Sequence, residues 1–259
     1  MAPGGVNMSN QIIMSIIFAE FIGTFLMMLL GLGVNANVAL KGTKGSYSSA
    51  SAWVLICAGW AFGVYVGVVV AGPISGAHLN PAVSAAMLVQ GSLSMADFAL
   101  FIPAQFAGAM LAAFAVWFMY RDHFEATDCL ETRRGVFCTA PEVYSLSRNF
   151  FSEFIGAFVL LFAIFHITDP EMLETGQKLG MGSLGALPVA IFVWGIGLSL
   201  GGTTGYAINP ARDLGPRLTH ALLPMKKKAD GNWSYAWIPV IAPITGGVIA
   251  ALLHQFLIS

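Results

Sequence analysis

Charged residues are scarce in this chain, and so are cysteines. Only 10% of its 259 residues are charged, whereas 57% are hydrophobic, and the mean hydropathy is +0.75. A soluble domain usually carries about 25% charged residues, so this composition predicts a membrane protein. The formal net charge of −1 gives no reason to expect nucleic acid as a partner.

The chain has three cysteines, too few for a disulfide framework or a structural zinc site. Cys57 lies in an apolar run and is expected to pack as a small hydrophobic residue. Cys129 and Cys138 share a polar stretch, and the sequence leaves open whether they are free or paired. The N-terminal segment lacks the basic region of a cleaved signal peptide, so we expect the first apolar run to stay as a membrane span.

Apolar stretches long enough to cross a bilayer, which takes about 20 residues, occur six times. The expected spans are Ile12–Leu40, Ala52–Ile74, Phe98–Tyr120, Phe150–Ile167, Leu184–Leu200 and Ala236–Ile258. Two segments that are too short to cross, Asn80–Val89 and Asn209–Leu222, follow the second and the fifth span. Polar connections are expected at Lys41–Ser51, Arg121–Arg148, Asp169–Gly182 and Met225–Tyr235.

Both short segments begin with the triplet Asn-Pro-Ala, at Asn80–Ala82 and at Asn209–Ala211. Asn is a favourable N-cap and Pro is favoured at the first helical position, so each triplet predicts the start of a helix that is entered from an irregular loop. Irregular backbone at membrane depth is tolerated only where it is buried in protein or lines a wet cavity. The meeting point of the two short helices is therefore the candidate pore.

The two halves of the chain repeat. One match pairs FAEFIGTF at 18–25 with FSEFIGAF at 151–158, and another pairs AQFAGA at 104–109 with APITGG at 242–247. We expect a single channel domain over residues 1–259, with repeats of about 11–120 and 149–258. Because each repeat has three spans and one half-span, the second must enter from the opposite side. This predicts an all-α membrane protein with six transmembrane helices and two re-entrant half-helices in an inverted repeat.

In SGAHLNPAV at 75–83 and GYAINPARD at 205–213, the chain resembles the major intrinsic proteins, the aquaporin and glycerol-facilitator family, over essentially its whole length. Asp213 after Arg212 is similar to the glycerol-facilitator branch, since the water-selective branch typically has a small residue there. The resemblance implies the aquaporin fold, a multi-pass protein of the cell membrane with both termini cytoplasmic, and a homotetramer in membrane lipid with one pore per subunit. It implies no metal and no cofactor.

The resemblance also assigns roles to individual residues. The central constriction would be formed by Asn80, Pro81, Ala82, Asn209, Pro210 and Ala211, where the positive ends of the two half-helices converge and exclude cations, as is known of aquaporin-type pores. The narrow selectivity filter would be formed by Trp60, Gly197, Tyr206 and Arg212. Backbone carbonyls would line the pore at Gly76, Ala77, His78, Gly205, Tyr206 and Ala207. Structural support would come from Glu20, Glu153 and Asp213.

The resemblance implies a passive channel, not an enzyme, that carries glycerol and other small uncharged solutes with some water. Water-selective members typically have His where Gly197 stands, so the absent side chain should widen the filter. Tyr206 replaces the usual Phe, which keeps open undissociated weak acids such as lactic acid, then urea, dihydroxyacetone or hydrogen peroxide. A secondary transporter is a further alternative, since inverted repeats with broken helices are common among transporters. The chain offers no pore-facing carboxylate pair for coupling apart from Glu20 and Glu153.

The charge distribution conflicts with the orientation that the family implies. Cytoplasmic termini would place most of the lysines and arginines of the connections outside and only Lys178 inside, whereas the positive-inside rule predicts the reverse. We follow the family, because re-entrant folds insert under internal constraints that the rule does not include. The basic run Lys226–Lys228 is more typical of a solvated loop than of a lipid head-group site.

Overall fold

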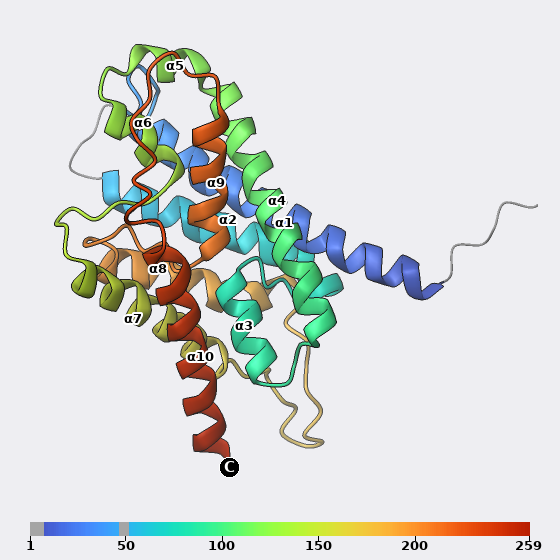
Figure 1. The fold of residues 1–259 in the computed structure, drawn as a ribbon. Coiled ribbons are helices and arrows are strands. Elements are labelled where there is room, and N and C mark those ends of the chain that lie inside the picture. The colour runs from blue at the N-terminus through green and yellow to red at the C-terminus, as the bar shows by residue number, and fades with distance from the viewer. Residues whose placement is uncertain (1–7, 47–51) are drawn as a thin grey trace, which may run out of the picture.

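The computed structural model describes residues 8–46 and 52–259, which form an almost entirely helical bundle (Figure 1). Six helices are long and apolar enough to cross a membrane, as the sequence predicted. They are α1 (Met8–Ala39), α2 (Ala52–Ser75), α4 (Met95–Met119), α7 (Leu146–Ile164), α8 (Leu187–Leu200, preceded by the short 3-10 helix Gly182–Ala186) and α10 (Ile238–Ile258). Within the described residues, extended pairing is limited to one bridge between Glu171 and Lys178.

Two short helices, α3 (Pro81–Val89) and α9 (Pro210–Leu222), begin at the Asn-Pro-Ala triplets. Asn80 Oδ1 accepts the amide of Ala82 at 2.8 Å, and Asn209 Oδ1 accepts the amide of Ala211 at 3.0 Å, so each asparagine caps its helix. At the other end of α9, the ammonium of Lys228 donates to the carbonyls of His220 at 3.1 Å and Leu223 at 3.0 Å. One lysine of the basic run thus neutralises the carbonyl end of a half-helix.

The helices pack in a way that interlocks the two halves of the chain. Within each half the first and third spans pack together, α1 with α4 and α7 with α10. The half-helices cross over, because α3 packs against α10 and α9 packs against α4. Each half-helix is therefore held by a span from the other half, which is the arrangement that an inverted repeat requires. The repeat boundaries themselves stay a prediction of the sequence.

The closest helix contacts occur at two matched glycines. A Cβ atom on Gly108 in α4 would collide with the carbonyl oxygen of Phe21 in α1, and a Cβ atom on Gly246 in α10 would collide with that of Phe154 in α7. Association in lipid depends on such close backbone approach, because lipid tails offer no hydrophobic driving force between helices.

The connection from Arg121 to Arg148 differs most from its expected form. It contains two helices, α5 (Arg121–Ala126) and α6 (Leu130–Phe137), which lie at the opposite end of the molecule from the C-terminus (Figure 1). The rings of Phe124 and Phe137 stack with centroids 5.3 Å apart and are fully buried. Burial of these few apolar side chains folds a stretch whose overall polarity suggested a loop. We call residues 120–145 the α5–α6 loop.

Cys57, Cys129 and Cys138 are free thiols, which settles the pairing that the sequence left open. Cys129 is exposed and Cys138 is buried in the α5–α6 loop. Burial raises the pKa of the Cys138 thiol to about 12. The Cys138 side chain is therefore a protonated, unreactive thiol at neutral pH, because the thiolate is the nucleophile.

Replacement of Gly108 by Ala should destabilise the folded protein. The added methyl group meets backbone of α1 rather than a flexible side chain, and overpacking of this kind costs about 1–3 kcal/mol. The measurement is the thermal unfolding midpoint in detergent. The matched control is Gly33→Ala, since a Cβ atom at Gly33 in α1 meets no heavy atom within 4 Å. Equal midpoints for the two variants would contradict the close packing at Gly108.

Candidate channel and its two constrictions

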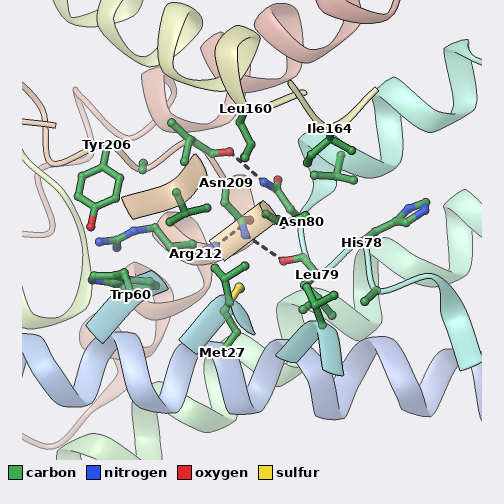
Figure 2. A pocket seen from close by; sticks show the side chains of 18 of the residues that line it. Met27, Trp60, His78, Leu79, Asn80, Leu160, Ile164, Tyr206, Asn209 and Arg212 are labelled. Atoms are coloured by element: carbon green, nitrogen blue, oxygen red, sulfur yellow. Dashed lines mark hydrogen bonds between the residues drawn. The ribbon is translucent and has the colours of Figure 1, made fainter. Parts of the chain in front are cut away.

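A cavity of about 350 Å³ runs along the junction of the two re-entrant loops (Figure 2). One wall is polar and consists of the loop residues next to α3 and α9, which are Gly76, Ala77, His78, Leu79, Asn80, Tyr206, Ala207, Ile208 and Asn209. The facing wall is apolar and comes from the spans, with Met27, Val64, Val68, Leu160, Ile164, Val189 and Val193 among its residues. A solute in this cavity meets hydrogen-bonding groups on one side and hydrocarbon on the other.

At the centre of the cavity, the two capping asparagines bind the opposite loops. Asn80 Nδ2 donates to the carbonyl of Ile208 at 2.9 Å, and Asn209 Nδ2 donates to the carbonyl of Leu79 at 2.9 Å. Each side-chain amide has two N–H groups, so one on each asparagine remains for a molecule in the cavity. The structure thus brings together the two ends that the sequence predicted to meet.

The loops follow an unusual backbone path. Ala77 and Leu79 in the first loop have φ of 53° each, and Tyr206 and Ile208 in the second have φ of 39° and 43°. Residues with side chains rarely adopt such left-handed angles, which persist only where the surroundings enforce them. The left-handed angles fall at Gly76, Ala77 and Leu79 in the first loop and at Gly205, Tyr206 and Ile208 in the second, so the two loops follow matching paths. Leu79 and Ile208 belong to this path although their side chains gave no such signal in the sequence.

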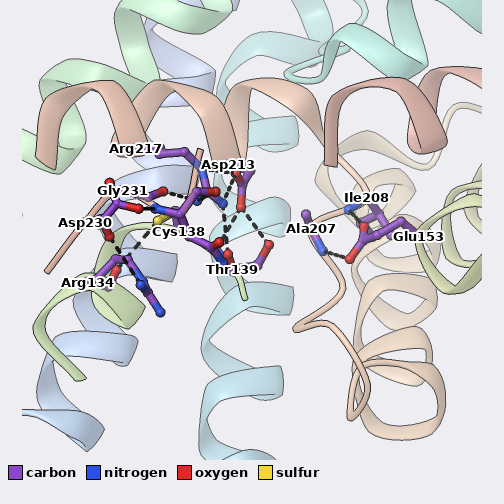
Figure 3. Close-up of polar contacts among 11 residues, drawn as sticks. Arg134, Cys138, Thr139, Glu153, Ala207, Ile208, Asp213, Arg217, Asp230 and Gly231 are labelled. Atoms are coloured by element: carbon purple, nitrogen blue, oxygen red, sulfur yellow. Dashed lines mark hydrogen bonds and ion pairs between the residues drawn. The ribbon is translucent and has the colours of Figure 1, made fainter. Parts of the chain in front are cut away.

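Two fully buried carboxylates provide that enforcement. Glu20 in α1 accepts the backbone amides of His78 at 2.9 Å and Leu79 at 2.8 Å. Glu153 in α7 accepts those of Ala207 at 2.9 Å and Ile208 at 2.8 Å (Figure 3). The carboxylates therefore satisfy the amides that the irregular loops leave without helical partners.

At one end of the cavity, Trp60 from α2 lies against Arg212 from α9. The guanidinium carbon of Arg212 is 4.1 Å from the centroid of the Trp60 ring, a cation–π contact. Both side chains are buried, and Nη1 of Arg212 has no hydrogen-bond partner within the described residues. A second cavity, of about 490 Å³, lies on the α5–α6 side and is also lined by Tyr206 and Arg212. These two residues therefore stand between the two cavities.

Gly197 does not line the cavity but makes room for Tyr206. A Cβ atom at Gly197 would lie 2.7 Å from Cζ of the Tyr206 ring and 2.9 Å from Sγ of Cys57. The sequence interpretation had the absent side chain widen the opening directly. In the structure the tyrosine ring occupies that space. Trp53, which the sequence analysis missed, packs edge-on against the ring at 5.7 Å and donates its indole N–H to the Gly197 carbonyl at 3.0 Å.

Asp213 is held in a buried network of its own (Figure 3). Its Oδ1 pairs with Arg217 Nη2 at 2.7 Å, and its Oδ2 accepts the amide and the hydroxyl of Thr139, each at 2.7 Å. Arg217 also donates to the carbonyls of Thr139 and Gly231. Asp213 therefore joins α9 to the α5–α6 loop. Because Asp213 follows Arg212 in the chain, its contacts also hold in place the helix turn from which the Arg212 side chain extends. A basic residue one turn after Asp213 was the signal in the sequence that could have identified Arg217.

The site offers hydrogen bonds and one guanidinium, and its lining contains no titrating acid. Within residues 8–46 and 52–259, no group of three or more His, Cys, Asp and Glu side chains could hold a metal ion. His78 lines the cavity at the end away from Trp60, and its ring packs against Phe101 at 5.0 Å. The arrangement suits passage or binding of a small neutral molecule.

Comparison with known proteins agrees with this geometry. The family model described as Major intrinsic protein matches residues 7–254. The glycerol uptake facilitator protein of Streptococcus pneumoniae (strain ATCC BAA-255 / R6) is 44% identical over 242 residues, which cover 93% of this chain and 99% of that protein. The probable glycerol uptake facilitator protein of Thermotoga maritima is 45% identical over 244 residues, 94% of this chain and 100% of that protein.

Two further relatives bear on fold and on solute. The D/L-lactic acid transporter of Lactiplantibacillus plantarum is 39% identical over 245 residues, 93% of this chain and 97% of that protein. The X-ray structure of the aquaglyceroporin from Plasmodium falciparum is similar with a TM-score of 0.81 at 29% identity, covering 95% of this chain and 97% of that chain. These matches confirm the fold and the family that the motifs predicted: the chain belongs to the major intrinsic protein family.

Proposed function

We propose that the chain is a passive channel of the cell membrane for glycerol and other small uncharged solutes, with some water. The observation that carries this proposal is the pairing of the Trp60 ring with Arg212 at 4.1 Å, at the end of a cavity with one polar and one apolar wall. The names of the glycerol uptake facilitator relatives support the same solute.

A three-carbon alcohol has a hydrocarbon edge and a hydroxyl edge, and the cavity has a counterpart for each. The ring of Trp60 and the apolar wall take the C–H edge. The free N–H groups of Arg212 and the loop carbonyls replace the hydrogen bonds that the hydroxyls give up on leaving water. Transport needs no covalent step, and we infer that the protein is not an enzyme.

Ions and protons are excluded at two places, the junction of the two half-helices and the Trp60–Arg212 pair. The N-terminal ends of α3 and α9 meet at Asn80 and Asn209, and each carries about half a positive charge. Arg212 adds a full positive charge at the filter. A cation that enters must shed water into this field without any carboxylate in the lining to receive it.

The family resemblance further supports a homotetramer with one pore in each subunit, surrounded by membrane lipid. Many large apolar side chains on the spans are exposed in the single chain, for example Phe62 at 60% and Phe118 at 64%, and these would face lipid or neighbouring subunits. Both termini would be cytoplasmic, which places the α5–α6 loop outside.

One observation favours a second candidate solute, an undissociated weak acid such as lactic acid. Tyr206 lines the cavity together with Arg212, at a position where glycerol facilitators usually have Phe, so the lining differs from theirs beside the guanidinium. The similarity to the D/L-lactic acid transporter supports this alternative.

Stopped-flow light scattering on vesicles that contain the purified protein distinguishes these candidates. Vesicles with the protein should re-swell in glycerol much faster than empty vesicles, at a rate linear in glycerol concentration and independent of ion gradients. The permeability to lactic acid, measured at low pH where the acid is undissociated, is compared with the permeability to glycerol and ranks the two solutes. Saturation at low millimolar glycerol with gradient-driven accumulation would instead indicate a secondary transporter.

Gly197→Ala should reduce glycerol permeability by roughly fivefold or more while water permeability falls less. The new methyl group displaces the Tyr206 ring towards the cavity, and overpacking by about 1–3 kcal/mol is enough for that factor. The matched control on the same helix is Gly195→Ala, because a Cβ atom at Gly195 meets no heavy atom within 4 Å. An equal loss of glycerol and water flow, or no loss at all, would contradict the placement of Tyr206 at the filter.

Cys129 should report the orientation of the chain. A membrane-impermeant maleimide added to intact cells should label the wild-type protein at Cys129, which is exposed in the α5–α6 loop, and should not label Cys129→Ser. Cys138 should stay unlabelled from pH 7 to pH 9, because its raised pKa of about 12 keeps the thiol protonated throughout that range. Labelling only after the cells are permeabilised would show that the loop is cytoplasmic.

A further inference from the structure

A buried asparagine in α1 connects the candidate filter to the α5–α6 loop. Asn35 Oδ1 accepts the indole N–H of Trp60 at 3.1 Å, and Asn35 Nδ2 donates to the backbone carbonyl of Val136 in α6 at 3.3 Å. Asn35 is 7% exposed and Trp60 is 4% exposed. One side-chain amide thus joins α1 to the neighbouring span α2 and to α6, which is 101 residues away in the sequence.

Two other contacts hold the Trp60 ring. A Cβ atom at Gly31, one turn before Asn35, would collide with the six-membered ring, so α1 packs directly against the indole. Arg212 stacks on the ring at 4.1 Å. The hydrogen bond to Asn35 adds a directional contact at the indole N–H, which restrains the χ1 and χ2 angles that place the ring.

The partner of Asn35 in the α5–α6 loop is close to the partner of Asp213. Val136 binds Asn35, and Thr139, three residues later, binds the carboxylate of Asp213 at 2.7 Å. Asp213 follows Arg212 in the chain. One short segment of the loop therefore anchors both Trp60 and the helix turn that carries Arg212.

We propose that Asn35 is a positioning residue that sets solute selectivity by holding the Trp60 ring in register with Arg212. This inference rests on the proposed function. Asn35 lines the cavity on the α5–α6 side rather than the cavity between the Asn-Pro-Ala helices, so it acts through Trp60 and not through contact with a solute in the filter. Glycerol passage depends on the orientation of the ring, whereas the smaller water molecule depends on it less.

The test compares Asn35→Leu with Asn37→Leu in reconstituted vesicles. Asn37 lies on the same helix and also uses its side chain, accepting the amide of Gly45 at 3.2 Å, but no hydrogen bond joins it to Trp60 within the part of the chain that the structure describes. Stopped-flow scattering gives the ratio of glycerol to water permeability for each protein. Asn35→Leu should lower this ratio by about fivefold, the factor that one buried hydrogen bond corresponds to. Asn37→Leu should leave it within about 1.5-fold, and the unfolding midpoints should show that both variants are folded.

A double-mutant cycle shows whether Asn35 acts through the indole N–H. Trp60→Phe removes that N–H, so Asn35→Leu should add less than about 1.5-fold to the effect of Trp60→Phe on the permeability ratio. Asn35→Ser is measured alongside. The short serine side chain cannot reach both the indole of Trp60 and the carbonyl of Val136, so the same fall in the permeability ratio is expected. If Asn35→Leu does not fold, Asn35→Ser tests the inference in its place.

The outcomes separate this inference from the proposed function. A wild-type protein that does not conduct glycerol would overturn the proposed function and the inference with it. A conducting wild type whose ratio is unchanged in folded Asn35→Leu or Asn35→Ser would overturn the inference alone. A full further fivefold fall on adding Asn35→Leu to Trp60→Phe would overturn it as well, because Asn35 would then act independently of the indole.

Discussion

The structure depends on the hydrogen bonds that two buried carboxylates accept from irregular backbone. Glu20 accepts from Ser75, His78, Leu79 and Gln105, and Glu153 accepts from Thr204, Ala207 and Ile208. Unsatisfied amides at membrane depth each cost several kcal/mol, and a carboxylate within a span is costly unless it is partnered. Here the carboxylates are the acceptors that the loop amides need, and the amides are the donors that the carboxylates need, so neither cost is incurred in full. Charge-assisted bonds from the loop amides hold the loops in their left-handed angles.

With the loops fixed, the remaining features follow from the ends of the half-helices. Each asparagine both caps its own helix and binds the loop of the other, so the two N-termini are clamped end to end. The clamp brings together the positive ends of the two helices, and Arg212, three residues into α9, adds its charge at the proposed filter. The apolar wall supplied by the spans completes a passage whose two sides differ in chemistry.

Repetition in the sequence made most of this architecture predictable. Six spans, two half-helices and their inversion follow from the apolar runs and the two Asn-Pro-Ala triplets, because membrane depth leaves few alternatives for irregular backbone. The α5–α6 loop was not predictable, since a handful of aromatic residues such as Phe124 and Phe137 folds it against a polar background. Asn35 and Trp53 were missed because their partners lie on other helices, which no local pattern encodes. Arg217 was missed although its position one turn after Asp213 could have indicated the pair.

The interlocking of the half-helices has a consequence for the order in which the protein assembles during synthesis. The first half-helix is complete only when Asn80 finds Ile208 and when Gln90 donates to Ala251, at sequence separations of 128 and 161 residues. The ribosome must therefore have made nearly the whole chain before α3 can complete its contacts. Until then, only partners in the first half are available to the first re-entrant segment, such as Glu20 for the loop and Gln105 for Ser84 of α3.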